Sequence, residues 1–362
     1  MSGKPKYKVP TMQEIASKEW NGYKVVSTFS GSGGSCLGYR MAGYKVLYAN
    51  EFVEEAQKTY KANHPNSYLD TRDIREVTPE SILSIIRMKK GEIDIFDGSP
   101  PCCAFSTAGV REKGWGEQRD YSDGKQQRVD DLFYEYIRIL NGLQPKVFIA
   151  ENVKGLITGS AKGYFKIFIR EMQNCGYEVK AALLNAAYLG VPQARERIIF
   201  CGVRKDLVEK YDVHPSFPAP FSYTYSLKEA FDGLVVDKEE AKQLEERTAG
   251  TKTGQLLKQI PQNPKKIIGL DEVSENGGYF SKRRESMCRP CSTITTVANL
   301  FHPLHDRPFT IGELKRLSSL PDDFITTGLF CKQQERIGRM VPPLMMKAVA
   351  EVVEHEILSK CK

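Results

Sequence analysis

Long apolar runs are missing from this sequence. None of its hydrophobic stretches approaches the ~18 residues that a membrane-spanning helix requires. The first 20 residues, MSGKPKYKVPTMQEIASKEW, carry charges but no apolar core. These absences argue against a membrane-spanning helix and a secretory signal peptide. The hydrophobic share of 41% and the charged share of 27% are ordinary for a globular protein.

A disulfide framework is also missing. The nine cysteines are an odd number and are scattered along 362 residues, which favours reduced thiols in a cytosolic protein. The CRPC segment at 288–291 has the C-x₂-C spacing of a zinc site but no partner pair. The adjacent Cys102 and Cys103 lack that spacing. We therefore expect no metal centre.

A strong excess of one charge is absent too. The net charge of +7 permits a polyanionic partner without identifying one. The length of 362 residues is enough for one large core and a second, smaller domain.

Short β-rich runs alternate with helical segments in the first half of the chain. The expected strands lie at 24–28, 45–52, 92–101 and 146–153, and the expected helices at 36–43, 53–63, 79–90, 130–143 and 164–175. This alternation predicts an α/β fold, with parallel strands and helices on both faces of a doubly wound sheet. In the helix at 130–143, Leu132, Tyr136 and Ile139 share one face.

Candidate ligand-binding residues follow the expected strands. Ligands of such sheets bind at the carboxyl ends of the strands, and the residues there are Gly31, Glu51, Asp97 with Cys102, and Glu151. The turn FSGSGGS allows close approach of the backbone to a ligand and precedes a helix start with free N–H groups. It lacks the third glycine of a dinucleotide fingerprint, because Cys36 stands there. These residues indicate a nucleoside-containing cofactor or a tight turn without a ligand.

An ordered set of motifs carries a more specific message. The chain contains, in order, FSGSGG, NEF, RDI, SPPC, ENV, VPQARER, RPCSTITT, RPFTIGELKRLSSLPDDF and GRMVPP. From about Lys24 to Leu358 this order resembles the cytosine carbon-5 DNA methyltransferase family. The resemblance implies a Rossmann-like methyltransferase domain at 1–204 and 301–362, with a smaller inserted target-recognition domain at 205–300.

The resemblance also implies a set of catalytic residues. Cys102, after a proline, would be the nucleophile that attacks carbon 6 of a flipped cytosine, and Glu151 would hold and protonate ring nitrogen 3. Arg197 would bind the exocyclic oxygen of the base, and Arg195 a phosphate or the closing loop. The two arginines are two apart and share one face if both lie on a strand, where a salt-bridged surface is the plainer interpretation. Cys103 stands where the family has glutamine, and its role stays open.

S-adenosylmethionine is the cofactor that the family uses. The implied contacts are Phe29, Gly31 and Gly33 in the cofactor turn, Glu51 at the ribose, Phe52 against the adenine, Asp73 at the adenine amino group with Ile74 beside it, and Pro101 and Leu132 near the reactive end. Glutamate and aspartate supply acceptors for the hydroxyl and amino groups.

Arg339 departs from the family, which has asparagine at this position near the transferable group. A positively charged arginine there would be repelled by the positive sulfonium of the donor. Three explanations stay open. Arg339 turns outward to a phosphate or a carboxylate, or it sits inward and impairs the enzyme. In the third, it binds the extra carboxylate of carboxy-S-adenosylmethionine, and the product is 5-carboxymethylcytosine.

The segment at 205–300 differs in composition from the rest of the chain. An aromatic cluster, FPAPFSYTYSL, is followed by the charged run DKEEAKQLEER and by lysine-rich KQIPQNPKK. Its position is that of the family's target-recognition region, and SKRRES at 281–286 is expected to contact phosphates. Beyond it, Thr310 and Glu313 predict a capping box, and the final helix is expected to pack back near the cofactor turn.

Three functions are compatible with these residues. The first is a restriction-modification type of methyltransferase acting as a monomer on double-stranded DNA, in the cytoplasm of a bacterial or phage-infected cell. The second keeps the chemistry on tRNA. The third is a catalytically dead nucleic-acid-binding regulator, which the presence of Cys102, Glu151 and Arg197 disfavours.

Overall fold

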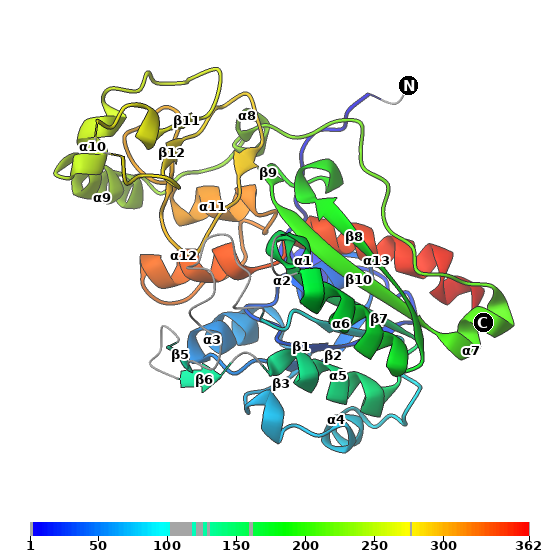
Figure 1. The fold of residues 1–362 in the computed structure, drawn as a ribbon. Coiled ribbons are helices and arrows are strands. Elements are labelled where there is room, and N and C mark those ends of the chain that lie inside the picture. The colour runs from blue at the N-terminus through cyan, green and yellow to red at the C-terminus, as the bar shows by residue number, and fades with distance from the viewer. Residues whose placement is uncertain are drawn as a thin grey trace. The chain divides into compact units, whose positions relative to one another are not determined.

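The computed structural model describes residues 3–101, 118–120, 126–128, 131–158, 162–275 and 277–361 (Figure 1). The chain forms two compact units. Unit 1 comprises Met1–Glu14, Asn185–Arg195 and Pro220–Met345, and unit 2 comprises Ile15–Leu184, Glu196–Ala219 and Met346–Lys362. None of the helices within the described ranges has the length and apolar character that a bilayer crossing needs.

Unit 2 is built around a seven-stranded sheet in the order β3-β2-β1-β4-β7-β10-β8. Its strands are β1 (Lys24–Thr28), β2 (Lys45–Asn50), β3 (Tyr68–Asp70), β4 (Ile95–Gly98), β7 (Val147–Val153), β8 (Tyr177–Asn185) and β10 (Glu196–Arg204). The pairs from β3 to β7 are parallel, which confirms the α/β prediction.

Strand β10 is the exception, because it runs antiparallel to β7. Only residues 186–195 connect β8 to its neighbour β10. A parallel crossover needs a dozen or more residues, usually with a helix. This connection is too short for that, which explains the antiparallel strand. The strands predicted at 24–28, 45–52, 92–101 and 146–153 are parallel, as expected.

Helices α2 (Gly34–Met41), α3 (Glu54–Asn63), α4 (Pro79–Ile86), α5 (Leu132–Leu143), α6 (Lys162–Asn174) and α7 (Lys205–Tyr211) belong to the same unit. Side chains of α4, α5 and α6 form one core with alternate residues of the strands, among them Val26, Phe96 and Phe148. The three residues predicted to share a face of α5 are all fully buried in or beside this core. The burial of one face on each element holds this half of the sheet together.

The carboxyl-terminal helix α13 (Pro343–Glu356) returns to the sheet. Beyond Met345 it belongs to unit 2, where the Tyr44 hydroxyl donates to the carbonyl of Ala350 over 2.9 Å. The Asn21 side chain donates to Glu354 over 2.9 Å. Unit 2 is therefore assembled from both ends of the chain, as expected.

Unit 1 contains short elements and long connections. Its helices include α8 (Leu227–Ala230), α9 (Lys238–Ala249), α10 (Lys252–Leu257), α11 (Ile311–Leu317) and α12 (Phe330–Arg339). One small sheet consists of β11 (Ile268–Gly269), β12 (Arg283–Arg284) and β14 (Leu300–Phe301). A second sheet pairs β9 (Gln193–Ala194) with β13 (Cys291–Ser292). The capping box of Thr310 and Glu313 at the start of α11 is confirmed. Glu313 also forms a buried ion pair of 2.8 Å with Arg307.

The bounds of unit 1 differ from those of the predicted target-recognition domain. Residues 205–219 belong to unit 2, whereas 301–345 belong to unit 1. A helix α1 (Met12–Ala16) and a small hairpin of β5 (Gln118–Asp120) and β6 (Gln126–Arg128) complete the described strands and α-helices. The assignment of target recognition to 205–300 stays a prediction.

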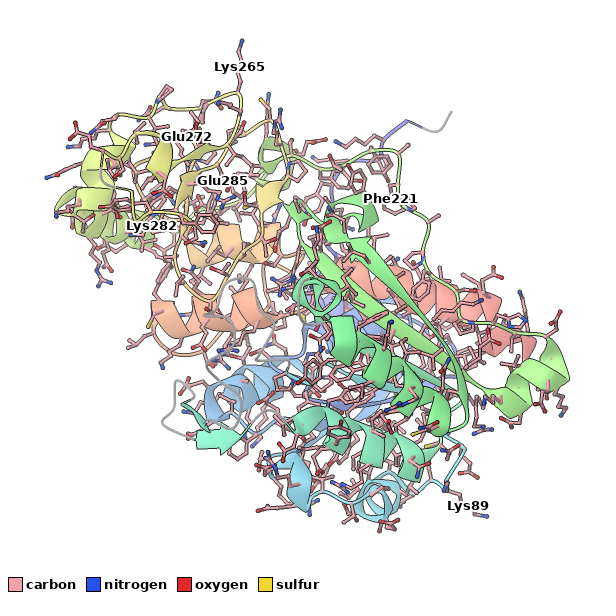
Figure 2. The ribbon with its side chains drawn as sticks, in the orientation of Figure 1. Lys89, Phe221, Lys265, Glu272, Lys282 and Glu285 are labelled. Atoms are coloured by element: carbon pink, nitrogen blue, oxygen red, sulfur yellow. The ribbon has the colours of Figure 1, made fainter. Side chains whose placement is uncertain are left out.

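Arg284 has a structural role that the sequence did not reveal. Its side chain is completely buried and donates to the carbonyls of Leu257, His302 and His305 over 2.9, 3.2 and 3.2 Å, and it pairs with Asp306. The expectation that the whole of 281–286 contacts phosphates is therefore wrong at Arg284. Its guanidinium is buried and already bonded to carbonyls of other segments, which it holds in place. Arg284 is on β12, and Figure 2 labels Lys282 and Glu285, the residues that precede and follow this strand in the sequence.

Candidate active site

The turn after β1 has an unusual backbone. Phe29, Gly31 and Gly33 have φ angles of 53°, 55° and 92°, in the left-handed region that costs a side-chain-bearing residue about 1–3 kcal/mol. A Cβ atom on Gly33 would lie 2.2 Å from Nε2 of His64. The turn therefore requires glycine at this position, for its conformation and for packing, and α2 begins at the next residue.

Glu51 connects this turn to the end of β2. One carboxylate oxygen accepts from the N–H of Gly31 over 2.8 Å, and the other accepts from the N–H of Val53 over 2.7 Å. A carboxylate offers about four lone-pair sites. Glu51 can therefore orient the turn and still accept hydrogen bonds from the hydroxyls of a ribose. Phe52, the next residue, is half-buried.

Asp73 caps a short 3₁₀ helix, η1 (Ile74–Glu76), that follows β3. Its carboxylate accepts from the N–H of Arg75 over 3.0 Å and forms an ion pair of 3.1 Å with the Arg75 side chain. Arg75 also pairs with Asp131 over 2.6 Å. Ile74 is only 2% exposed and belongs to the sheet core, so its side chain holds the start of η1 against that core.

The strand that leads to the predicted nucleophile is β4. After it, the chain passes through Pro100, which is buried, and Pro101, which is half-buried. Cys102 and Cys103 lie outside the described residues. The side-chain amide of Asn152, on β7, donates to the carbonyl of Pro100 over 3.3 Å. This contact fixes the backbone two residues before Cys102, and the sequence analysis did not identify Asn152.

Glu151 and Arg197 form an ion pair across β7 and β10. The distance from Nε of Arg197 to the carboxylate of Glu151 is 2.9 Å, and their side chains are 14% and 11% exposed. Burial lowers the pKa of the Arg197 guanidinium, while the Glu151 charge opposes that shift. Arginine stays protonated in proteins, so the pair offers a fixed positive group next to a carboxyl group.

Asp97 lies on β4 directly beside Ser27 of β1. Its carboxylate accepts from the Ser27 hydroxyl over 3.0 Å and from the Tyr39 hydroxyl over 3.2 Å, and Ser30 donates in turn to Ser27 over 3.0 Å. Burial raises the pKa of Asp97 to about 7, the two hydroxyls lower it, and the charge of Glu151 raises it slightly. A chain of hydroxyls therefore links the glycine turn to a buried carboxyl group on the strand before Cys102.

Replacing Asp97 by asparagine should remove a pH dependence of stability. Its pKa is higher in the folded state, about 7 against 3.8, so its contribution to stability is present below pH 4 and is lost as the pH rises through 7. At about 1.4 kcal/mol per pKa unit, the two pH units between pH 5 and the folded-state pKa of about 7 should make the gain in unfolding free energy from Asp97→Asn roughly 3 kcal/mol larger at pH 8 than at pH 5. Urea unfolding at both pH values measures this.

Asp94→Asn is the matched control for this experiment. Asp94 is buried at the start of β4 but is paired with Lys146 over 2.8 Å. Removal of its charge should destabilise the protein at pH 8, because the Lys146 ammonium loses its partner. Equal effects of Asp97→Asn at pH 5 and pH 8 would contradict the argument.

The remaining predicted site residues, Arg195 and Arg339, belong to unit 1. Arg195 lies between β9 and β10, not on one strand with Arg197, so that expectation is wrong. It is 3% exposed and donates to the carbonyl of Ile294 over 3.1 Å. Arg339 is exposed and forms an ion pair of 3.0 Å with Glu335, one turn earlier on α12.

The residues at the ends of β1, β2 and β3 fit S-adenosylmethionine. Glu51 and Asp73 supply the carboxylate acceptors that a ribose and an adenine amino group need. The buried hydroxyl of Ser32, in the glycine turn, has no hydrogen-bond partner within the described ranges. Such an orphaned buried hydroxyl in the turn suits a polar ligand. In the same ranges, no cluster of three His, Cys, Asp or Glu side chains is arranged to hold a metal ion.

Comparisons with known proteins show the family of the chain. The model of the family described as C-5 cytosine-specific DNA methylase matches residues 23–355. The chain belongs to this family. It is 32% identical over 342 residues to the type II methyltransferase M1.HphI of Haemophilus parahaemolyticus, which covers 91% of this chain and 86% of that protein.

Other relatives support the assignment to the C-5 cytosine-specific DNA methylases. The type II methyltransferase M.Sau96I of Staphylococcus aureus is 32% identical over 369 residues, covering 96% of this chain and 80% of that protein. A solved structure of an Escherichia coli prophage protein, assigned as a DNA modification methyltransferase, has a TM-score of 0.69 at 21% identity and covers 92% of this chain and 99% of its own. The latter likeness shows the shared fold. As a member of this family, the protein is an S-adenosylmethionine-dependent DNA cytosine C5-methyltransferase.

Proposed function

We propose that Cys102, Glu151 and Arg197 form the catalytic group of this DNA methylase. The observation that carries the proposal is the buried ion pair between Glu151 of β7 and Arg197 of β10. The next residue of β7, Asn152, donates a hydrogen bond to the carbonyl of Pro100, two residues before Cys102. Arg195, buried beside Ile294, is proposed to support the loop that closes over the base.

The chemistry follows from the residue types. Carbon 5 of cytosine is a poor nucleophile until the thiolate of Cys102 adds to carbon 6 and makes the ring an enamine. Glu151 holds ring nitrogen 3 and gives it a proton, and Arg197 binds the exocyclic oxygen. S-adenosylmethionine supplies the methyl group that carbon 5 takes. Loss of the proton on carbon 5 then expels the Cys102 thiolate and restores the aromatic ring.

The proposed cofactor contacts lie within unit 2. Phe29, Gly31 and Gly33 shape the turn, Glu51 accepts from the ribose, Phe52 packs against the adenine and Asp73 accepts from its amino group. Pro101 and Leu132 are proposed to lie near the methyl group, and the buried Ile74 supports Asp73.

The transferred group is proposed to be methyl and not carboxymethyl. The carboxymethyl alternative needs a free guanidinium at Arg339 to bind the extra carboxylate of carboxy-S-adenosylmethionine. Glu335 already pairs with that guanidinium over 3.0 Å. This contact supports the explanation in which Arg339 faces a carboxylate of its own helix.

The substrate is proposed to be double-stranded DNA, read by residues 205–300 and bound by a monomer. A base inside a duplex has to be flipped out of the stack before a thiolate can attack it from above the ring. The bacterial type II methyltransferases among the relatives support a role in restriction-modification in the cytoplasm of a bacterial or phage-infected cell.

A competition experiment tests the proposed substrate and the proposed donor. The protein is incubated with duplex DNA or with tRNA, in each case with S-adenosylmethionine and carboxy-S-adenosylmethionine present together. Mass spectrometry of the digested nucleic acids should find 5-methylcytosine in DNA alone, and Arg339→Asn should leave the product unchanged. Modified tRNA without modified DNA would overturn the substrate. A 5-carboxymethylcytosine product that Arg339→Asn converts to 5-methylcytosine would overturn the donor.

A further inference from the structure

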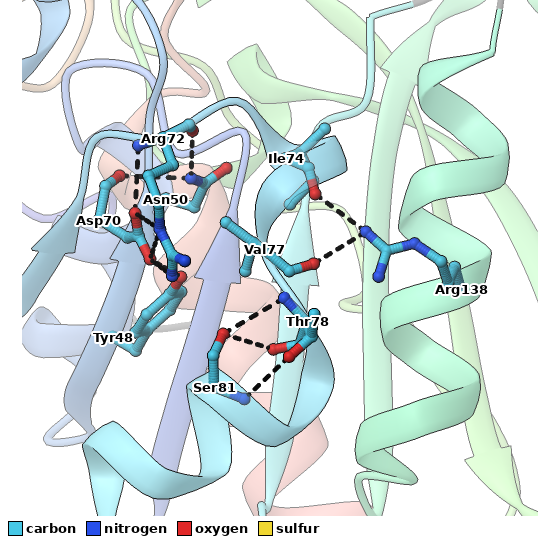
Figure 3. Close-up of polar contacts among 9 residues, drawn as sticks. All are labelled: Tyr48, Asn50, Asp70, Arg72, Ile74, Val77, Thr78, Ser81 and Arg138. Carbon is cyan, nitrogen blue, oxygen red and sulfur yellow. Dashed lines mark hydrogen bonds and ion pairs between the residues drawn. The ribbon is translucent and has the colours of Figure 1, made fainter.

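Arg138, on α5, holds both ends of the short helix η1. One guanidinium nitrogen donates to the carbonyl of Ile74 over 2.9 Å and to the carbonyl of Val77 over 2.8 Å (Figure 3). Ile74 opens η1 and Val77 is its carboxyl cap. The two carbonyls are thus fixed by one cation from a neighbouring helix, and the sequence analysis gave Arg138 no role.

The Arg138 side chain is itself held in place. Its guanidinium forms an ion pair of 2.6 Å with Glu135, one turn earlier on α5. Hydrogen bonds from a charged donor to a carbonyl are roughly twice as strong as those between neutral groups. A guanidinium with a fixed direction loses little side-chain freedom when it makes them. The contact is therefore strong enough to set the position of η1.

The opposite side of the same turn is held by a second group. The Asn50 side chain donates to the carbonyls of Asp70 and Arg72 over 3.3 and 3.0 Å. The Asp70 carboxylate accepts from the Tyr48 hydroxyl over 2.8 Å and pairs with Arg72 over 2.6 Å. Figure 3 shows these contacts on one side of the turn and Arg138 on the other. In the sequence, Asp73 lies between Arg72 and Ile74, so both groups act on its immediate neighbours.

We propose that Arg138 is a positioning residue that sets the Asp73 carboxylate for recognition of the adenine amino group of the methyl donor. The proposal rests on the role of Asp73 in the proposed function. Without Arg138, the carbonyls of Ile74 and Val77 lose their only charged donor among the hydrogen bonds of the described residues, and η1 can shift on its cap. A shift of about 1 Å is enough to weaken a positioned contact.

This role predicts that a variant without Arg138 discriminates less between a cofactor that carries adenine and one that carries hypoxanthine. S-adenosylhomocysteine carries an amino group that Asp73 accepts from, whereas S-inosylhomocysteine carries a carbonyl oxygen that the carboxylate repels. The wild-type enzyme should bind the first at least about tenfold more tightly, since a site built for a hydrogen bond rejects the analogue that lacks it. Arg138→Ala should reduce that ratio to within about threefold and raise the KM for S-adenosylmethionine, with kcat at saturating donor and the KM for DNA nearly unchanged.

Inhibition constants of both homocysteine analogues, measured on the full-length enzyme, provide the test. Arg170→Ala is the matched control, because Arg170 also pairs with a glutamate of its own helix, over 3.5 Å, but is 68% exposed. Arg138→Lys keeps the charge with a single ammonium and serves if the alanine variant does not fold. For Arg138→Lys, the ratio of the two inhibition constants should fall between the ratios of the wild type and of Arg138→Ala.

Two different failures can be told apart. If the wild type does not discriminate, or Asp73→Ala discriminates as well as the wild type, the role proposed for Asp73 is wrong. If Asp73→Ala loses discrimination while folded Arg138→Ala and Arg138→Lys keep the wild-type ratio, Asp73 acts as proposed and the positioning role of Arg138 is overturned.

Discussion

Cys102→Ser is expected to abolish the covalent complex that the enzyme forms with duplex DNA containing 5-fluorocytosine. Fluorine at carbon 5 cannot leave as a proton does, so the thiolate adduct at carbon 6 stays trapped when Cys102 is present. A serine hydroxyl is a far weaker nucleophile than a thiolate. Methyl transfer to ordinary DNA should fall by at least about 10³-fold, as is typical when a nucleophile is removed. Denaturing electrophoresis detects the adduct.

Cys103→Ser is the matched control, because it removes a thiol one residue away. The two prolines before Cys102 restrict the backbone, and Asn152 fixes the carbonyl of Pro100 over 3.3 Å. These constraints act on Cys102 first, so Cys103→Ser should keep the adduct and at least about a tenth of the activity. Trapping by Cys102→Ser but not by Cys103→Ser would make Cys103 the nucleophile.

Glu151→Gln is expected to lower kcat by about 10²- to 10⁴-fold, the usual contribution of a positioned acid or base. Glutamine keeps an oxygen that accepts from Nε of Arg197, but its amide cannot transfer a proton to the ring nitrogen. The KM for S-adenosylmethionine should change less than threefold, because the proposed donor contacts belong to Glu51 and Asp73. Steady-state kinetics with radiolabelled donor separate the two parameters.

Glu196→Gln tests whether any lost carboxylate nearby has the same effect. Glu196 precedes Arg197 on β10, but it is 39% exposed and pairs with Lys154 over 2.8 Å. Exposed pairs contribute about 0–1 kcal/mol, so its activity should stay within twofold of the wild type. The proposed role of Glu151 is wrong if Glu151→Gln, shown to be folded by its thermal transition, retains more than a tenth of the wild-type kcat.

The places where sequence reasoning erred have physical reasons. The predicted alternation of strands and helices ended at residue 175, so it gave no direction for the later strand β10. The spacing of Arg195 and Arg197 suggested a shared strand face, but Arg195 lies in the break between β9 and β10. Charge alone suggested that Arg284 faces phosphates, whereas burial against carbonyls decides its role.

Residue order alone determined the fold class, the glycine turn and the candidate carboxylates, because these depend on local periodicity, on backbone conformation and on motifs that are contiguous in the chain. Only the tertiary structure decided which groups meet. The pairing of Glu151 with Arg197, the hydroxyl chain to Asp97 and the hold of Arg138 on η1 each join segments far apart in sequence. Such contacts depend on strand register and side-chain burial, which follow from the packing of the whole core.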